Sequence, residues 1–193
     1  MSNPRLDLVV GCNGAGKTTL IRTLLTHAIP GSALVNADDI AAARYPDNAA
    51  AMAYEAAQIA DIMRQQLIAA KVSFIAETVF SHPSKLDLIG SAHAAGFRVF
   101  LHVVTIPEDL AVSRVARRVT QGGHSVPEDK VRGRYQRVWG HAARAIALAD
   151  GAYIYNNEDS TMSRVAVFDQ GQLIRSGKIP EWLPADLRRL LND

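Results

Sequence analysis

Eight residues near the N-terminus have the composition and spacing of a phosphate-binding loop. They run Gly11-Cys12-Asn13-Gly14-Ala15-Gly16-Lys17-Thr18 and fit the pattern G-x-x-x-x-G-K-[ST], between an apolar segment that reads as a strand and a segment that reads as a helix. Glycines let such a loop curl so that its backbone N–H groups point at phosphate oxygens. In this pattern Lys17 reaches the β- and γ-phosphates and the Thr18 hydroxyl is a ligand of Mg²⁺. The residues we expect to contact ATP are Gly11, Asn13, Gly14, Ala15, Gly16, Lys17, Thr18 and Thr19.

Acidic residues follow the next two segments that read as strands. Asp38 and Asp39 come after the first of these, where P-loop kinases hold an acid that can take a proton from an attacking hydroxyl. We expect Asp38 to be the catalytic base, with Asp39 as the second choice; an aspartate that caps a helix is the alternative. Glu77 and Thr78 follow the second segment, at the carboxyl edge where α/β sheets bind ligands. We expect both to face the substrate, orienting Mg²⁺ through water or holding an acceptor hydroxyl.

A basic segment lies in the second half of the chain. Residues 112–137 contain seven Lys or Arg and two acids. Arg114, Arg117 and Arg118 have the i, i+3, i+4 spacing of one helix face, and further arginines follow beyond Gly122-Gly123. Two arginine-bearing helices joined by a glycine loop predict a lid over approximately 112–137 that stabilises charge on a transferring phosphoryl group. A solvated helix face is the simpler alternative.

Strand-like and helix-like segments alternate along the chain, which predicts an α/β fold. The 193 residues, of which 48% are hydrophobic and 21% charged, suffice for one domain with a sheet buried on both faces. We predict a single P-loop kinase-like domain over 1–193: a three-layer sandwich with a mainly parallel central sheet, a helical lid and a C-terminal hairpin. The expected strands are 6–10, 33–36, 72–76, 97–105, 152–155, 165–168 and 172–175. A helix from Met52 is expected to bury a face that includes Ile59 and Met63.

Composition and missing motifs narrow the function. No segment approaches the roughly 20 apolar residues that span a bilayer, and the N-terminus lacks the apolar core of a signal peptide, so we expect a cytoplasmic protein without a membrane. The net charge is only +2 and aromatic residues make up 6%, so we do not expect a nucleic-acid partner. The LSGGQ signature of ABC ATPases and the N-K-x-D motif of GTPases are both absent from the sequence.

Several of these segments contain sequence motifs typical of one protein family. The sequence reads Asn-Ala-Asp-x-Ile-Ala at 36–41, Glu-Thr at 77–78, Arg-Val-x-x-Arg-Val-x-x-Gly-Gly-His-x-Val-Pro-Glu at 114–128 and Arg-Tyr at 134–135. Over roughly residues 5–160 it resembles the zeta-toxin-like P-loop kinases, closest to a small bacterial branch labelled predicted ABC-type ATPase. It departs from them at Arg132-Gly133-Arg134, where the family often has a run of arginines, and at Asn156-Asn157, where it has Asp-Asn.

The resemblance carries implications for the site. It implies a kinase fold, Asp38 as the base, and Arg118 and Arg134 as the lid arginines that contact the phosphates during catalysis. Because characterised zeta toxins phosphorylate UDP-N-acetylglucosamine, that nucleotide sugar becomes a candidate acceptor. It also makes an antitoxin-like protein partner conceivable, although no segment of the sequence points to one. His124, within the Gly-Gly-His segment, is expected to hold the loop through a hydrogen bond rather than to touch a phosphate.

Three functions stay open on the sequence alone. The leading one is an ATP-dependent phosphotransferase with a small-molecule hydroxyl as acceptor. The second is a nucleotide-binding ATPase or regulator without an acceptor, in which Asp38 would position water. The third is a polynucleotide 5′-hydroxyl kinase, which would need a basic groove lined with exposed aromatic residues.

Overall fold

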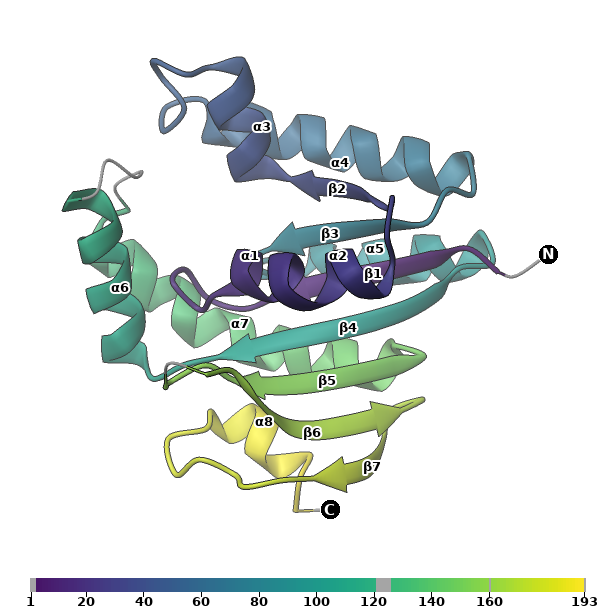
Figure 1. Cartoon of the computed structure of the whole chain (residues 1–193), viewed down its shortest axis with the longest axis vertical. Helices are drawn as coiled ribbons and strands as arrows, with labels where there is room; N and C mark the ends of the chain where they lie inside the picture. The colour runs from purple at the N-terminus through teal and green to yellow at the C-terminus, as the bar shows by residue number, and fades with distance from the viewer. Residues whose placement is uncertain (1–2, 121–125, 160, 193) are drawn as a thin grey trace.

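A seven-stranded sheet forms the centre of the molecule (Figure 1). The computed structural model describes residues 3–120, 126–159 and 161–192. The strands lie in the order β2-β3-β1-β4-β5-β6-β7; the first five are parallel, and β6 pairs antiparallel with both β5 and β7. Their bounds are β1 Arg5–Val10, β2 Ala33–Asn36, β3 Phe74–Thr78, β4 Arg98–Thr105, β5 Gly151–Asn156, β6 Ser163–Asp169 and β7 Gln172–Ser176. The predicted mainly parallel sheet and C-terminal hairpin are confirmed.

Helices cover both faces of the sheet, which makes the three-layer arrangement that alternation predicts (Figure 1). On one face lies the segment α1 (Lys17–Leu20), η1 (Ile21–Leu25, a π-helical turn) and α2 (Thr26–Ala28), while α5 and α7 lie on the other. The remaining bounds are α3 Ala37–Arg44, α4 Ala53–Ala69, α5 Ser84–Ala94, α6 Glu108–Thr120, α7 Glu128–Leu148 and α8 Ala185–Arg189. In the described part of the chain, no helix is long and apolar enough to cross a membrane.

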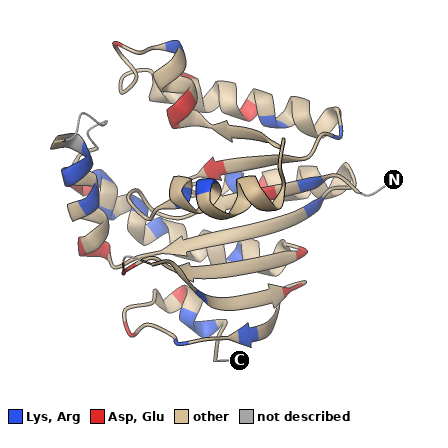
Figure 2. Cartoon of the chain, in the orientation of Figure 1, with Lys and Arg blue, Asp and Glu red and all other residues tan. Residues whose placement is uncertain are grey.

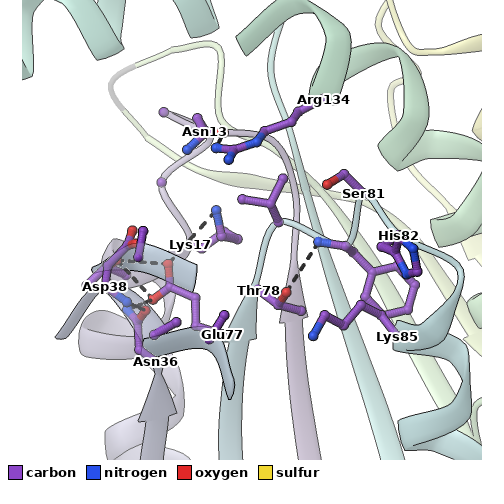
Figure 3. A pocket seen from close by; sticks show the side chains of 18 of the residues that line it. Asn13, Lys17, Asn36, Asp38, Glu77, Thr78, Ser81, His82, Lys85 and Arg134 are labelled. Atoms are coloured by element: carbon purple, nitrogen blue, oxygen red, sulfur yellow. Dashed lines mark hydrogen bonds and ion pairs between the residues drawn. The ribbon is translucent and has the colours of Figure 1, made fainter. Parts of the chain in front are cut away.

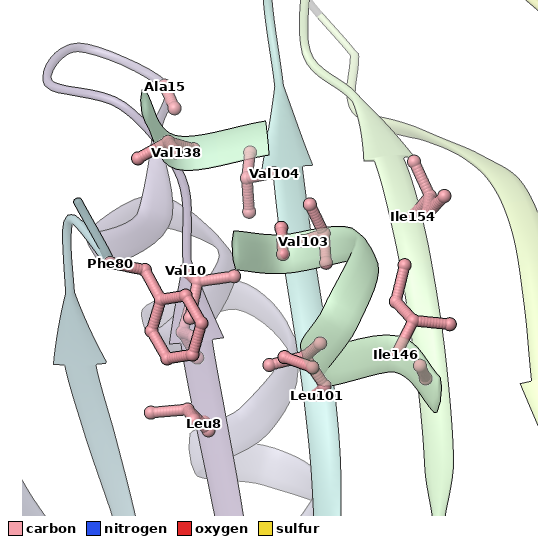
Figure 4. Close-up of a cluster of buried hydrophobic side chains, with 14 of the residues drawn as sticks. Leu8, Val10, Ala15, Phe80, Leu101, Val103, Val104, Val138, Ile146 and Ile154 are labelled. Atoms are coloured by element: carbon pink, nitrogen blue, oxygen red, sulfur yellow. The ribbon is translucent and has the colours of Figure 1, made fainter. Parts of the chain in front are cut away.

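The core lies where the central strands meet α5 and α7. Leu8 and Val10 of β1 pack beside Leu101 of β4, and Ile146 of α7 lies on the same apolar layer (Figure 4). All of these side chains are fully buried, because a parallel sheet with helices on both faces has no solvent-facing side. The rigid core fixes the carboxyl ends of the strands, and the loops that start there carry the polar residues discussed below.

Two local expectations were wrong. Glu77 and Thr78 are the last two residues of β3 rather than residues that follow it. We expected Met63 on the buried face of α4, but Met63 is 37% exposed and the adjacent Arg64 is only 4% exposed. The buried stripe of α4 is Ala56, Ala60, Arg64 and Ile68. An arginine inside that stripe needs a polar partner or a cavity, because a buried charge without either is costly.

The basic segment forms α6, at the carboxyl end of the central strands, and the first part of α7; Figure 2 shows the Lys and Arg residues along α6. Helix α6 ends at Thr120, and α7 begins at Glu128 (Figure 1). The predicted Gly122-Gly123 hinge and His124 lie outside the described residues. Tyr135 and Trp139 of α7 are buried against each other, with ring centroids 5.1 Å apart, so both pack in the core.

Candidate functional site

The loop between β1 and α1 has a backbone that requires glycine. Gly11 has φ +152°, and a Cβ there would lie 2.4 Å from the carbonyl oxygen of Val104. Gly16 has φ +95°, and a Cβ there would lie 2.2 Å from Nδ2 of Asn157. Both approaches are closer than any real Cβ contact, so a larger residue would push the loop away from its neighbouring strands.

The loop presents most of its predicted residues to one cavity of about 570 Å³. The predicted nucleotide-contacting residues that line it are Asn13, Gly14, Gly16, Lys17, Thr18 and Thr19. Gly11 and Ala15 do not line it; both are buried behind the loop, where they shape its backbone. Cys12 is also buried, and burial raises the pKa of its thiol to about 12. Its thiol therefore stays protonated, as expected for a small loop residue that is not a nucleophile.

Four polar side chains meet at the floor of the cavity (Figure 3). Thr18 Oγ1 donates to both carboxylate oxygens of Glu77, at 3.1 and 3.0 Å, and Asn36 Nδ2 donates to Glu77 Oε2 at 3.1 Å. Lys17 Nζ donates to the carbonyl oxygen of Cys12 at 3.1 Å and lies 3.9 Å from Glu77 Oε1. The ammonium is thus held at the mouth of the loop by a backbone oxygen and a carboxylate, both of which a phosphate can replace.

The partners of the Glu77 carboxylate do not fully offset the cost of burying its charge. It is 8% exposed, and desolvation raises its pKa, an effect that the nearby Lys17 ammonium and the Thr18 hydroxyl only partly offset. The neighbouring Asp38 and Asp39 carboxylates raise it further. A buried anion with surplus negative charge around it is a favourable place for a cation.

Asp38 lies on the cavity wall and Asp39 does not line it. Helix α3 begins directly after β2, and the Asn36 side chain caps it by accepting a hydrogen bond from the backbone N–H of Asp38 at 2.9 Å. The capping residue is therefore the asparagine, not an aspartate. Since Asn36 supplies the cap, the Asp38 carboxylate is left to face the cavity (Figure 3).

The arginines of α6 and α7 divide into two groups. Arg114, Arg118 and Arg134 line the cavity, and Arg134 Nη1 donates to Asn13 Oδ1 of the loop at 3.3 Å. Arg132 instead pairs with Glu128 at 2.9 Å and with Asp109 at 3.0 Å on the protein surface. The arginines that line the cavity thus come from both α6 and α7.

The opposite wall of the cavity carries residues that we did not predict. They come from α4, from the segment that joins β3 to α5, and from the first turn of α5: Arg64, Val79, Phe80, Ser81, His82 and Lys85. Figure 3 shows Ser81, His82 and Lys85 across the cavity from Lys17 and Asp38. The sequence signal for this wall was an arginine, Arg64, among the buried apolar residues of α4. It can be recognised only when it is known which face of α4 is buried.

Asn157, just after β5, is a second unpredicted residue. Its Nδ2 donates to the carbonyl oxygen of Ala15 at 2.8 Å, so it holds the phosphate-binding loop from the carboxyl end of β5. Where the family has Asp-Asn, this chain has Asn156-Asn157. The second asparagine, which contacts the loop, is therefore retained.

The oxygen donors beside Lys17 fit a magnesium ion. Mg²⁺ prefers hard oxygen ligands and takes one or two from the protein, with phosphates and water supplying the rest. Thr18 Oγ1 and the Glu77 carboxylate provide such oxygens next to the phosphate-binding loop. Within the described residues, no three or more His, Cys, Asp or Glu side chains gather around a point that could hold a metal by themselves. The site therefore suits an ion that arrives with a nucleotide.

Comparison with known proteins assigns the family. The family model described as "Zeta toxin" matches residues 1–172. The chain belongs to the zeta toxin family. A relative of this zeta toxin family member, an uncharacterised protein of Haemophilus influenzae, is 30% identical over 126 residues, which cover 65% of this chain and 88% of that protein.

Solved structures agree with the fold of this zeta toxin family member. The crystal structure of the complex AvrRxo1-ORF1:-ORF2 with ATP contains a chain that is 18% identical, with a TM-score of 0.69 over 89% of this chain. Only 60% of the length of that chain is matched. The PezAT toxin–antitoxin system of Streptococcus pneumoniae contains one that is 14% identical, with a TM-score of 0.66 over 100% of this chain and 88% of that one. The fold is that of the P-loop kinases.

Proposed function

We propose that the protein is an ATP-dependent phosphotransferase that moves the γ-phosphoryl group of ATP to the hydroxyl of a small molecule. The observation that carries this proposal is the placement of Asp38 in the same cavity as Lys17 of the phosphate-binding loop, with open space between them and the far wall (Figure 3). An ATPase needs the loop and a water site, whereas a second wall lined by polar side chains suits an acceptor molecule.

ATP is the proposed donor. The loop supplies backbone N–H groups and the Lys17 ammonium for the phosphates, and the helix that follows adds its partial positive charge. A complex of one structural relative was solved with ATP. Thr18, with Glu77 behind it, would hold Mg²⁺, which when bound neutralises charge on the β- and γ-phosphate oxygens.

The transfer itself is a single displacement. The acceptor oxygen forms a bond to the γ-phosphorus, and the bond from that phosphorus to the oxygen bridging to the β-phosphate breaks. Asp38 accepts the proton of the acceptor hydroxyl, and ADP leaves with the bridging oxygen. Arg118 and Arg134 lie on the lid side of the cavity, where their guanidinium groups would stabilise charge on the phosphoryl oxygens as it develops.

The acceptor we propose is a polyhydroxyl molecule of the nucleotide-sugar type, for which UDP-N-acetylglucosamine is the first candidate. Asp38 and Glu77 lie on one side of the cavity, so one carboxylate can activate a hydroxyl while the other, with Thr78, holds its neighbour. We also propose that 1–193 acts as one kinase-like domain with 112–137 as its lid. An antitoxin-like protein partner is part of the same proposal, since one structural relative belongs to a toxin–antitoxin system.

Mass spectrometry of a reaction mixture tests the proposal. The protein is incubated with Mg²⁺-ATP and UDP-N-acetylglucosamine, and then with a panel of other hydroxyl metabolites, with Lys17→Ala as the inactive control. A product heavier by one phosphoryl group, formed by the wild type only, is the expected result. If another metabolite gains the phosphoryl group, the kinase stands and the acceptor is reassigned. ADP and free phosphate alone, across the whole panel, would replace the kinase with the ATPase alternative.

A further inference from the structure

The far wall of the cavity holds a pair of cations away from the phosphate-binding loop. Arg64 comes from α4 and Lys85 from the first turn of α5, and both line the same cavity as Lys17. We propose that Arg64 and Lys85 form an anion-binding subsite, and hence that the acceptor carries a carboxylate or phosphate group apart from its reacting hydroxyl. This inference rests on the proposed phosphotransferase function and names the substrate class of that site.

Arg64 is placed to present its guanidinium to a ligand. Its side chain is 5% exposed, yet it lines the cavity, so its remaining exposure is toward that space. Its backbone position belongs to the buried stripe of α4, between Ala60 and Ile68, where an apolar residue would ordinarily pack. Among the described residues, Arg64 Nη2 donates a hydrogen bond to Asp61 Oδ1. A guanidinium has five N–H donors, so most of them are left for a group in the cavity.

Lys85 and Arg64 share a single carboxylate. Lys85 Nζ lies 3.1 Å from Asp61 Oδ1, the same oxygen that accepts from Arg64. The Asp61 side chain is 56% exposed, and its neighbouring cations hold its pKa below the ordinary value even though burial acts in the opposite direction. Asp61 thus stays ionised and orients both cations. Two positive charges against one negative charge leave a surplus of one, which matches a carboxylate or a phosphate ester.

The subsite is separate from the part of the cavity that the triphosphate needs. Lys17 belongs to the phosphate-binding loop and Arg134 contacts it through Asn13, whereas Lys85 lies with Ser81 and His82 across the cavity from Lys17, Asp38 and Glu77 (Figure 3). A ligand anchored by an anion on the far wall would therefore place its hydroxyl toward Asp38. The hydroxyl of Ser81 and the ring of His82 would supply further hydrogen bonds to that anchor.

Binding to matched pairs of molecules tests the inference independently of transfer. The full chain is saturated with Mg²⁺ and a non-hydrolysable ATP analogue, and calorimetry measures affinity for glycerol against glycerate, glucose against glucose 6-phosphate, and N-acetylglucosamine against UDP-N-acetylglucosamine. In at least one pair the anionic member is expected to bind about 10-fold more tightly or better, as a hydrogen-bonded charge provides. The three pairs distinguish a carboxylate, a phosphate monoester and a diphosphate.

Variants assign the preference to the two cations. Lys85→Met and Arg64→Met should each weaken binding of the preferred anion about 10-fold and leave the affinity for the ATP analogue within about twofold. Arg22→Met and Lys178→Met, which remove exposed cations outside the cavity, should change neither. Since Arg64 is buried, its variant is also made as Arg64→Lys, and the half-buried Lys85 carries the test if both fail to fold.

The outcomes separate this inference from the proposed function. No preference within any pair, or a preference that survives both Lys85→Met and Arg64→Met, overturns the anion subsite; if Arg64→Met does not fold, survival in Lys85→Met alone overturns it. Transfer of phosphoryl to a neutral acceptor with unaffected variants would keep the kinase and reject the subsite. An anion preference that depends on Lys85 and Arg64, without transfer to any acceptor, would keep the subsite and reject the kinase.

Discussion

Two carboxylates are buried in neighbouring strands of the sheet, and their surroundings differ. Asp7 of β1 is 0% exposed, and Glu77 of β3 is 8% exposed. Asp7 accepts hydrogen bonds from His102 Nε2 at 2.8 Å and from Arg5 Nη2 at 2.7 Å. Burial acts to raise its pKa, but these bonds outweigh burial and hold the pKa below the ordinary value. For Glu77 burial wins, and the pKa is raised.

The difference follows from position along the strands. Asp7 lies within β1, beside Ile75 of β3 and Phe100 of β4, and does not line the cavity. Glu77 lies near the carboxyl end of β3, where its cation partner, Lys17, also belongs to the phosphate-binding loop. A fully satisfied carboxylate stabilises the fold, whereas a partly satisfied one leaves binding capacity for a substrate and its metal. Each of the following experiments changes either the surroundings of Asp7 or the site around Glu77.

The largest effect is expected for Lys17. Lys17→Ala removes the point charge from the β- and γ-phosphates, so ATP affinity should fall at least about 10-fold and phosphoryl transfer by about 10³-fold or more. Nucleotide titration and a transfer assay measure the two. Activity near that of the wild type would show that the loop does not bind the phosphates. Arg22→Ala, an exposed cation just after the loop, is the matched control and should behave as wild type.

The second prediction concerns the base. Asp38→Asn keeps the shape of the side chain but cannot take a proton, so transfer should slow by about 10²–10⁴-fold while ATP affinity stays within a few-fold. Asp39→Asn, one residue along and off the cavity wall, should have little effect. Single-turnover kinetics with both variants decide between them. If Asp39→Asn is the damaging change, the choice of base was wrong.

The third prediction concerns Asp7. Asp7→Asn removes the charge that Arg5 and His102 bind, so the free energy of unfolding should fall by about 2–3 kcal/mol. Asp129→Asn, an exposed acid at the start of α7, should change it by less than about 0.5 kcal/mol. Urea denaturation measures both. The folded Asp7→Asn protein should keep its transfer rate within a few-fold, and a large loss of rate would mean that the two carboxylates are coupled.

The phosphate-binding loop and the strands could be predicted because their signals are local. The loop motif, the apolar strands and the Asp169-Gln170-Gly171 turn each lie within a few residues, and β2 has the bounds expected. Asn157 could not be predicted, since it contacts Ala15 from 142 positions away. Arg64 was hidden for another reason: two apolar stripes fit α4, and only packing against α3 and β2 selects the one that buries Arg64.

The fourth prediction tests the lid side of the cavity. Arg118→Ala and Arg134→Ala should each slow transfer by about 10–100-fold and weaken ATP binding by less than about threefold, since their contacts strengthen as charge develops on the phosphoryl group. Arg117→Ala removes an exposed neighbour that does not line the cavity and is the control. Comparing the rate with the nucleotide dissociation constant separates the two effects. Equal losses in both would indicate contacts made already in the ground state.

The smallest effect is expected for the free energy of unfolding of Glu77→Gln. This variant also tests the comparison of Asp7 with Glu77 most directly. Burial raises the pKa of Glu77, so its ionised form opposes folding. The stability that the neutral form provides is fully present below the ordinary pKa of 4.5. It is lost as the pH rises through the raised pKa of the folded protein. Glutamine mimics the neutral form. The variant should therefore be more stable than the wild type at pH 7 by up to about 1 kcal/mol, with the gain vanishing near pH 4.

Urea denaturation of both proteins from pH 4 to pH 8 measures this slope. Transfer by Glu77→Gln should fall, because the carboxylate beside Thr18 no longer attracts the cation, so stability and activity move in opposite directions. Asp7→Asn must instead be less stable than the wild type throughout this pH range, since the lowered pKa of Asp7 means that its charge stabilises the fold above 3.8 and stops doing so only on further acidification. A Glu77→Gln protein less stable than the wild type at pH 7 would place Glu77 with Asp7 among the carboxylates that hold the sheet together.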